Sequence, residues 1–241
     1  MIQCLEANIA ANNATNIRVE KTALGDRKGS IRFLEASAWG HVSQNGSEVP
    51  ITTLVEIIER LKLPRVDFIK IDVEGSEFSI MRTSLDLINR FECLVLVELN
   101  SWTQLDVANV NPREFIEWIL ASFSHVFMLR RGSSAGDLLE PVTNGRALLY
   151  RNMVTDGCIS DLLLTNAERR LVPSAEMRHA PRISVLAHGR ALALAPRPNC
   201  PCPRDSCSKS LNHALVVSTS LQSARSAPGW RPVLFSRGPL P

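Results

Sequence analysis

The sequence predicts an α/β fold in which a mostly parallel, doubly wound sheet is covered by helices on both faces. Two nearly continuous apolar runs, residues 66–72 and 93–99, are typical of strands that are buried on both faces. Strand-like and helix-like patterns alternate over residues 1–166, as right-handed β-α-β crossovers require. The chain of 241 residues is long enough to give such a domain a sizeable core.

The individual elements are placed by their apolar spacing and by the residues at their ends. Thr53 with Glu56 predicts a capping box, and Pro112 after Asn111 stands where a first helical turn favours proline. We expect helices over about residues 2–12, 53–63, 76–91 and 112–123. We expect strands over residues 16–24, 30–35, 66–72, 93–99, 125–130 and 147–150, a loop over residues 36–50, and a short apolar segment at residues 159–164.

The composition changes at about residue 167. Residues 167–241 hold ten of the 14 prolines, and their ten Arg, one Lys and three acids give a net charge of +8. Residues 1–166 carry 16 basic and 21 acidic residues, or −5, which argues against a nucleic-acid partner for the folded part. Because apolar patterns interrupted by proline rarely build a core, we expect residues 167–241 to form a basic, mostly disordered tail.

The sequence also limits where the protein acts. No stretch approaches the roughly 20 apolar residues of a membrane helix, and the first residues lack the pattern of a secretory signal. The six cysteines are scattered, unlike a disulfide framework. We therefore expect a cytoplasmic protein without a membrane partner. Cys200, Cys202, Cys207 and His213 match no standard zinc spacing, so we expect no metal there.

The candidate catalytic residues follow the first buried strand. Asp72 and Glu74 are two apart, so in an extended chain they point to the same face, at the sheet edge where ligands bind in open α/β sheets. Two carboxylates there could orient a hydroxyl, accept a proton or share a divalent cation. Alternatively, these acids, with Glu77 in the first turn of the next helix, merely bind backbone amides at the helix start.

Lys70 lies inside the same strand and on the same side as Asp72. A buried ammonium group without a partner is costly, so Lys70 needs an anion beside it. It either holds a catalytic carboxylate or a substrate oxygen, or forms an ion pair with Glu98 at the end of the next strand. The sequence leaves both readings open.

The segment Lys70–Glu77, with the sequence KIDVEGSE, resembles the FkbM-type S-adenosylmethionine-dependent methyltransferases. The resemblance implies a class I methyltransferase-like (Rossmann-like) fold over residues 1–166, S-adenosylmethionine as cofactor, and methyl transfer to a hydroxyl oxygen of a small molecule or sugar. It implies catalytic roles for Asp72 and Glu74, supported by Lys70. Leu24, Gly25 and Asp26 would border the adenine. Weaker similarity is present at Leu5–Asn8, Asn12–Asn13, Thr22–Asp26, Ile51–Leu54, Leu96–Glu98 and Asp161–Leu163.

The chain departs from that family in one respect: the first strand, its glycine-containing cofactor loop and the acid that ends the second strand have no counterpart. We therefore expect an N-terminally truncated domain that binds the cofactor weakly or is inactive. Without a first strand, residues 66–71 would expose a sheet edge and promote dimerisation or aggregation. Two rival functions remain, a non-catalytic fold remnant that acts as an interaction protein, and a metal-dependent transferase that uses Asp72 and Glu74.

Overall fold

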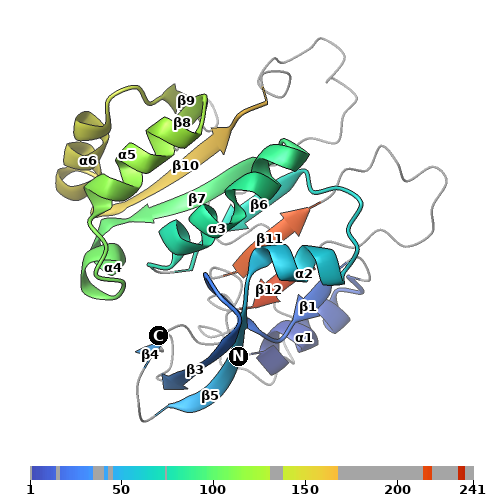
Figure 1. The fold of residues 1–241 in the computed structure, drawn as a ribbon. Coiled ribbons are helices and arrows are strands. Elements are labelled where there is room, and N and C mark those ends of the chain that lie inside the picture. Colours follow the sequence, from blue (N-terminus) through green and yellow to red (C-terminus); the bar gives the residue numbers. More distant parts are fainter. Residues whose placement is uncertain are drawn as a thin grey trace.

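The computed structural model describes residues 2–14, 17–34, 41–42, 46–73, 75–130, 138–167, 214–218 and 233–236. Figure 1 shows their arrangement. The helices are α1 (Ile2–Ala11), α2 (Leu54–Arg60), α3 (Glu77–Phe91), α4 (Ser101–Asp106), α5 (Pro112–Ser122) and α6 (Gly145–Val154). The strands are β1 (Arg18–Glu20), β2 (Ala23–Leu24), β3 (Gly29–Leu34), β4 (His41–Val42), β5 (Ser47–Thr52), β6 (Phe68–Ile71), β7 (Leu94–Asn100), β8 (His125–Arg130), β9 (Leu138–Pro141), β10 (Ile159–Thr165), β11 (Ala214–Ser218) and β12 (Val233–Ser236).

The described strands form two sheets. The larger sheet has eight strands in the order β1-β12-β11-β6-β7-β10-β8-β9, and the smaller has four in the order β2-β5-β3-β4 (Figure 1). In the larger sheet only β6 with β7 and β1 with β12 are parallel neighbours, because β9, β10 and β11 run against the strands beside them. Most neighbouring strands of the larger sheet are therefore antiparallel. The sheet is mixed, and the expectation of a mostly parallel sheet is wrong.

The direction of the strands nevertheless brings the carboxyl ends of several strands to the same end of the larger sheet. Followed through the pairings, β1, β12, β6, β7 and β8 all run the same way. Their carboxyl ends therefore lie along a common edge of the larger sheet, the kind of edge at which ligands bind in α/β folds. Asp72 directly follows β6 at this edge.

The main hydrophobic core lies on one face of the larger sheet. In β6 the side chains of Ile69 and Ile71 are fully buried, whereas those of Phe68 and Lys70, which alternate with them, are half-buried. The burial therefore alternates along β6, as expected for a strand whose two faces differ. Helices α2, α3 and α5 contribute fully buried apolar side chains to the same cluster, among them Leu54, Ile57, Ile80, Met81 and Phe115.

Local end signals of the helices are confirmed. Thr53 and Glu56 form the predicted capping box at the start of α2. The Asn111 side chain accepts a hydrogen bond from the Arg113 amide before α5, with Pro112 in the first turn. α3 is the longest described helix, with 15 residues, and none of the helices in the described ranges is long and apolar enough to cross a bilayer.

Three segments differ from the sequence-based expectation. Residues 147–150, expected as a strand, lie in α6, because Asn144 caps a helix by accepting the Ala147 amide. Residues 159–164, expected as a short apolar segment, form most of β10, which pairs with both β7 and β8 inside the sheet. Residues 47–50, expected in a loop, belong to β5, which pairs with β2 and β3.

The basic tail contributes two strands to the larger sheet. β11 pairs antiparallel with β6, and β12 pairs with β11 and β1, as the orange and red arrows of Figure 1 show. Residues 168–213, 219–232 and 237–241 lie outside the described residues, so the expectation of a mostly disordered tail stays a prediction. The edge of β6 that the sequence predicts to be open carries β11.

Candidate functional site

The centre of the candidate site is an ion pair at the end of β6. The Lys70 ammonium lies 3.0 Å from Oδ2 of Asp72, and the two side chains are 14% and 7% exposed. Lys70 and Asp72 therefore lie on the same face, as the sequence predicts. Asp72 supplies an anion beside the Lys70 ammonium, as the sequence requires. The pair places a negative carboxylate, held by a positive charge, at the carboxyl edge of the sheet.

Glu77 binds backbone amides near the start of α3, which is the structural role that the sequence offered as an alternative to catalysis for Asp72, Glu74 and Glu77. Its carboxylate is fully buried and accepts hydrogen bonds from the backbone amides of Val73, at 2.9 Å, and Gly75, at 2.8 Å. These two contacts hold the loop between β6 and α3. Glu74 lies outside the described residues, so its expected position beside Asp72 stays a prediction.

Gly75 brings the same loop against α4. The backbone φ of Gly75 is +111°, a value that residues with a side chain rarely adopt. A Cβ atom at this position would lie 2.9 Å from the carbonyl oxygen of Thr103 and 3.3 Å from Cβ of Ala108. Thr103 belongs to α4, which starts directly after β7. The ends of β6 and β7 therefore meet through this glycine, and only a residue without a side chain fits there.

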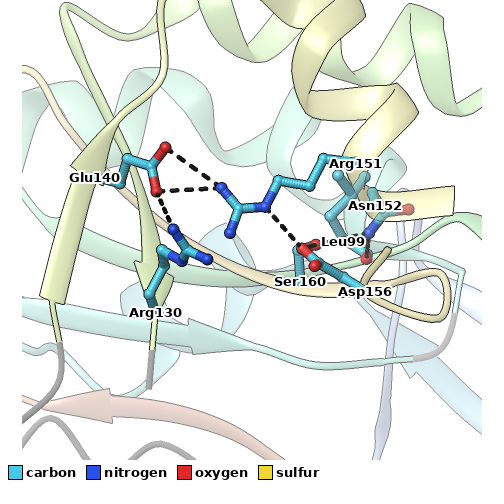
Figure 2. Close-up of polar contacts among 7 residues, drawn as sticks. All are labelled: Leu99, Arg130, Glu140, Arg151, Asn152, Asp156 and Ser160. Carbon is cyan, nitrogen blue, oxygen red and sulfur yellow. Dashed lines mark hydrogen bonds and ion pairs between the residues drawn. The ribbon is translucent and has the colours of Figure 1, made fainter. Parts of the chain in front are cut away.

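The end of β7 is held by Asn152, a residue that the sequence reasoning did not single out. Asn152 of α6 is fully buried, and its amide donates to the carbonyl oxygen of Leu99 at 3.0 Å and to Oγ of Ser160 at 2.8 Å (Figure 2). Its own oxygen accepts the Ser101 hydroxyl at 2.5 Å. One asparagine thus joins β7, α4 and β10. Nothing in the local sequence, where Asn152 follows Arg151, singles it out, because Leu99 and Ser101 lie about fifty residues earlier.

A set of charged residues beside Asn152 holds α6 in place. The Glu140 carboxylate accepts from Arg151 at 3.1 and 3.3 Å and from Arg130 at 3.2 Å, while Nε of Arg151 lies 3.6 Å from Oδ2 of Asp156 (Figure 2). The hydrogen bond from Arg151, with the charges of Arg151 and Arg130, holds the pKa of Glu140 below its usual value. These charged groups pair with one another and join β8, β9, α6 and the turn before β10. We therefore assign them a structural role.

The residues expected beside the adenine lie in the smaller sheet. Leu24 is buried in the same core cluster as Ile69 and Ile71. The Gly25 amide donates to the Thr52 carbonyl at 3.0 Å, and a Cβ atom on Gly25 would come within 2.3 Å of the Ile51 side chain. Asp26 is exposed and lies 3.4 Å from Arg27. Of the three residues, Asp26 alone presents polar side-chain atoms to solvent, so the fit to a cofactor is partial and the assignment stays a prediction.

Within the described residues, no group of three or more His, Cys, Asp or Glu side chains is placed to hold a metal ion. Glu74 and the Cys200–His213 segment lie outside those residues.

Comparison with known proteins gives one match. No curated protein and no solved structure matches the chain. The model of the family described as Methyltransferase FkbM domain matches residues 2–136, from α1 through β8, and the Lys70–Asp72 pair and the Gly75 loop lie in the middle of this range. Because the match spans more than half of the 241 residues, the chain belongs to the FkbM methyltransferase domain family.

Proposed function

We propose that this protein transfers a methyl group from S-adenosylmethionine to the hydroxyl oxygen of a small-molecule acceptor such as a sugar. One observation carries the proposal: the range that matches the family model contains the Lys70–Asp72 pair, at the common carboxyl end of β6 and β7. S-adenosylmethionine, when bound, supplies the methyl group as an electrophile. The protein must then position an oxygen in line with that group and exclude water.

Asp72 is the residue proposed to act on the acceptor. Its carboxylate accepts a hydrogen bond from the acceptor hydroxyl, orients the oxygen and takes up the proton that the hydroxyl loses. The Lys70 ammonium at 3.0 Å holds the Asp72 carboxylate in one orientation. Lys70 is therefore a positioning residue. Glu74, two residues further along, is proposed as the second carboxylate of the site, and Asp26 as a polar contact of the cofactor.

A second candidate function is that of a non-catalytic interaction protein that keeps the fold. The observation that favours it is the neighbour of β6. A class I methyltransferase sheet places its first strand there, whereas here the neighbour is β11, which runs antiparallel to β6. An antiparallel strand presents its amino end, not the turn that follows its carboxyl end, at the edge where Asp72 lies. A metal-dependent transferase would rest on Glu74 beside Asp72 and stays the third possibility.

Calorimetric titration and a methyl-transfer assay separate these functions. The full chain is titrated with S-adenosylmethionine, and labelled methyl transfer is measured with a panel of hydroxyl acceptors. We expect Asp72→Asn to lower kcat by a factor of about 100 or more while leaving cofactor affinity unchanged. Asp86→Asn, an exposed acid on α3, is the matched control and should change neither. Cofactor binding without turnover would favour the interaction protein, and no binding at millimolar cofactor would overturn the assignment.

A further inference from the structure

The side chain of Gln104 is buried without a hydrogen-bond partner. Gln104 of α4 is fully buried, and among the residues that the structure describes neither its Nε2 donor nor its Oε1 acceptor has a partner. Buried polar groups in proteins are nearly always paired, and an unpaired one lowers the stability of the fold. Asn152, an equally buried amide, has three partners. The unpaired amide of Gln104 therefore calls for an explanation other than stability.

The packing of α4 is the reverse of that of an ordinary amphipathic helix. Its buried residues are Ser101, Thr103 and Gln104, whereas the side chains of Trp102 and Leu105 are 61% and 49% exposed. A surface helix normally buries its apolar side chains and exposes its polar ones. Few buried apolar contacts therefore hold α4 in place, which is typical of segments that move when a ligand binds.

The helix α4 lies at the candidate site. It follows β7 directly, at the end of the larger sheet where Asp72 follows β6 (Figure 1). The loop after Asp72 packs against α4, because a Cβ atom on Gly75 would lie 2.9 Å from the carbonyl oxygen of Thr103, the residue before Gln104. Asp26, the proposed contact of the cofactor, follows β2 of the smaller sheet instead. The position of Gln104 therefore favours a contact with the acceptor.

We propose that Gln104 binds the methyl acceptor, and that this acceptor carries a second hydroxyl next to the one that is methylated. A carboxamide offers an acceptor oxygen and an NH₂ donor. The second hydroxyl donates to Oε1 of Gln104, and Nε2 donates to the neighbouring oxygen. Two adjacent hydroxyls of a sugar ring have this arrangement. The inference rests on the proposed methyl transfer and narrows its acceptor to vicinal diols.

The enclosure of Gln104 means that the acceptor reaches it only after α4 has moved. Ser101 anchors the start of α4, since its amide donates to the Cys158 carbonyl at 2.9 Å and its hydroxyl bonds to Asn152. No residue of α4 belongs to the main core cluster. The later residues of α4 can therefore swing outward from Ser101 without breaking up that core.

The thermal stability of two variants tests whether the Gln104 amide is unpaired. Gln104→Met replaces the amide by an apolar side chain of similar length, so we expect a Tm at or above that of the wild type. Asn152→Leu is the matched control. It removes an equally buried amide that has partners, and should lower the Tm by at least about 5 °C or prevent folding. A Tm of Gln104→Met below that of the wild type would show that its amide supports the fold, and would overturn the proposal.

Ligand binding by the full chain tests the contact itself. Calorimetric titrations compare cis-cyclohexane-1,2-diol and methyl α-glucoside, which carry vicinal hydroxyls, with cyclohexanol, which carries one. We expect the wild type to bind the two diols about tenfold or more tightly than cyclohexanol, and Gln104→Met to lose this preference. No preference for the diols in the wild type, or a preference that survives in Gln104→Met, would overturn the proposal.

A methyl-transfer assay separates failure of this inference from failure of the proposed function. We expect Gln104→Met to raise the KM for methyl α-glucoside about tenfold and to leave the affinity for S-adenosylmethionine unchanged. Turnover with an unchanged KM would overturn the acceptor contact and leave methyl transfer standing, and a lost cofactor affinity would overturn the contact by assigning Gln104 to the cofactor. Diol binding that depends on Gln104 without any turnover would support the diol site and count against methyl transfer.

Discussion

The backbone amide of Gly75 donates a 2.8 Å hydrogen bond to the Glu77 carboxylate, inside the loop that follows β6. The same carboxylate accepts the Val73 amide, so one buried side chain holds the loop on both sides of residue 74. Asp72 is the residue immediately before this loop. The position of Asp72, the candidate catalytic residue, therefore depends on Glu77, to which we assign a structural role and no chemical one.

Replacement of Glu77 by Gln should destabilise the protein. Hydrogen bonds to a charged acceptor become hydrogen bonds to a neutral one, and the new NH₂ group would face backbone donors in a fully buried place. We expect a loss of about 1–3 kcal/mol in the free energy of unfolding, measured by urea denaturation. Glu59→Gln, an exposed glutamate on α2, is the control and should change stability by less than about 0.5 kcal/mol. Equal effects of the two substitutions would contradict the role of Glu77.

Replacement of Gly75 by Ala should be worse than the same change at Gly157. Both glycines have positive φ, +111° and +65°, but a Cβ atom at Gly157 meets nothing within 4 Å, whereas at Gly75 it lies 2.9 Å from the Thr103 carbonyl. We expect about 1 kcal/mol of destabilisation for Gly157→Ala, and roughly 2–5 kcal/mol for Gly75→Ala because overpacking is added to backbone strain. Thermal unfolding of both variants, measured side by side, would refute this if Gly157→Ala were the more damaging.

Replacement of Asn152 by Ala removes the contacts that join β7, α4 and β10. The Leu99 carbonyl and the Ser101 hydroxyl would lose a buried partner, so we expect a loss of about 2–4 kcal/mol in unfolding free energy. Asn144→Ala at the exposed start of the same helix removes only a cap and should cost about 1 kcal/mol. Chemical denaturation distinguishes the two variants, and an Asn152→Ala protein as stable as Asn144→Ala would show that the buried network contributes little.

The start of α2 should lose stability in acid. The Thr52 hydroxyl donates to the Glu56 carboxylate at 2.5 Å, and this hydrogen bond, followed by the Thr53 amide and the Lys28 charge, lowers the pKa of Glu56 below its usual value. A pKa that is lower in the folded than in the unfolded protein contributes stability that is fully present above the unfolded pKa and is lost as the pH falls through the folded pKa.

The substitution Thr52→Val isolates this effect. The stability difference between wild type and Thr52→Val should be largest at pH 6 and should shrink toward pH 3, as measured by urea denaturation at both values. A difference that is the same at pH 6 and at pH 3 would mean that the hydroxyl does not act through the charge of Glu56.

Signals carried by a few neighbouring residues were enough to predict two helix starts and the shared face of Lys70 and Asp72. The capping box of α2, the start of α5 and the shared side of Lys70 and Asp72 each depend on contacts within four residues along the chain. Such contacts are dictated by backbone period and side-chain type. The role of Glu77 was available as an alternative for the same reason, since its amide partners are two and four residues away.

The features that the sequence did not predict depend on partners far along the chain. β10 reads as a short apolar run, and only its pairing with β7 and β8 makes it an interior strand. The run at residues 147–150 suits a strand or a helix, and Asn144 decides for the helix. Asn152 bonds to Leu99 and Ser101, about fifty positions earlier, so no local pattern could reveal it. The partners of β6 in the tail were hidden by the surrounding prolines.

The pairing of β1 with β12 affects how the protein folds during its synthesis. Arg18 is synthesised long before its register partner Val233, and Lys70 must likewise wait for Val216. Until then the nascent chain carries a β6 that can pair with β7 but not yet with β11. Pairings of such high contact order form slowly, and the interval exposes a strand edge to other nascent chains or to chaperones. Expression yield should accordingly respond to chaperone supply more than the stability of the finished protein would suggest.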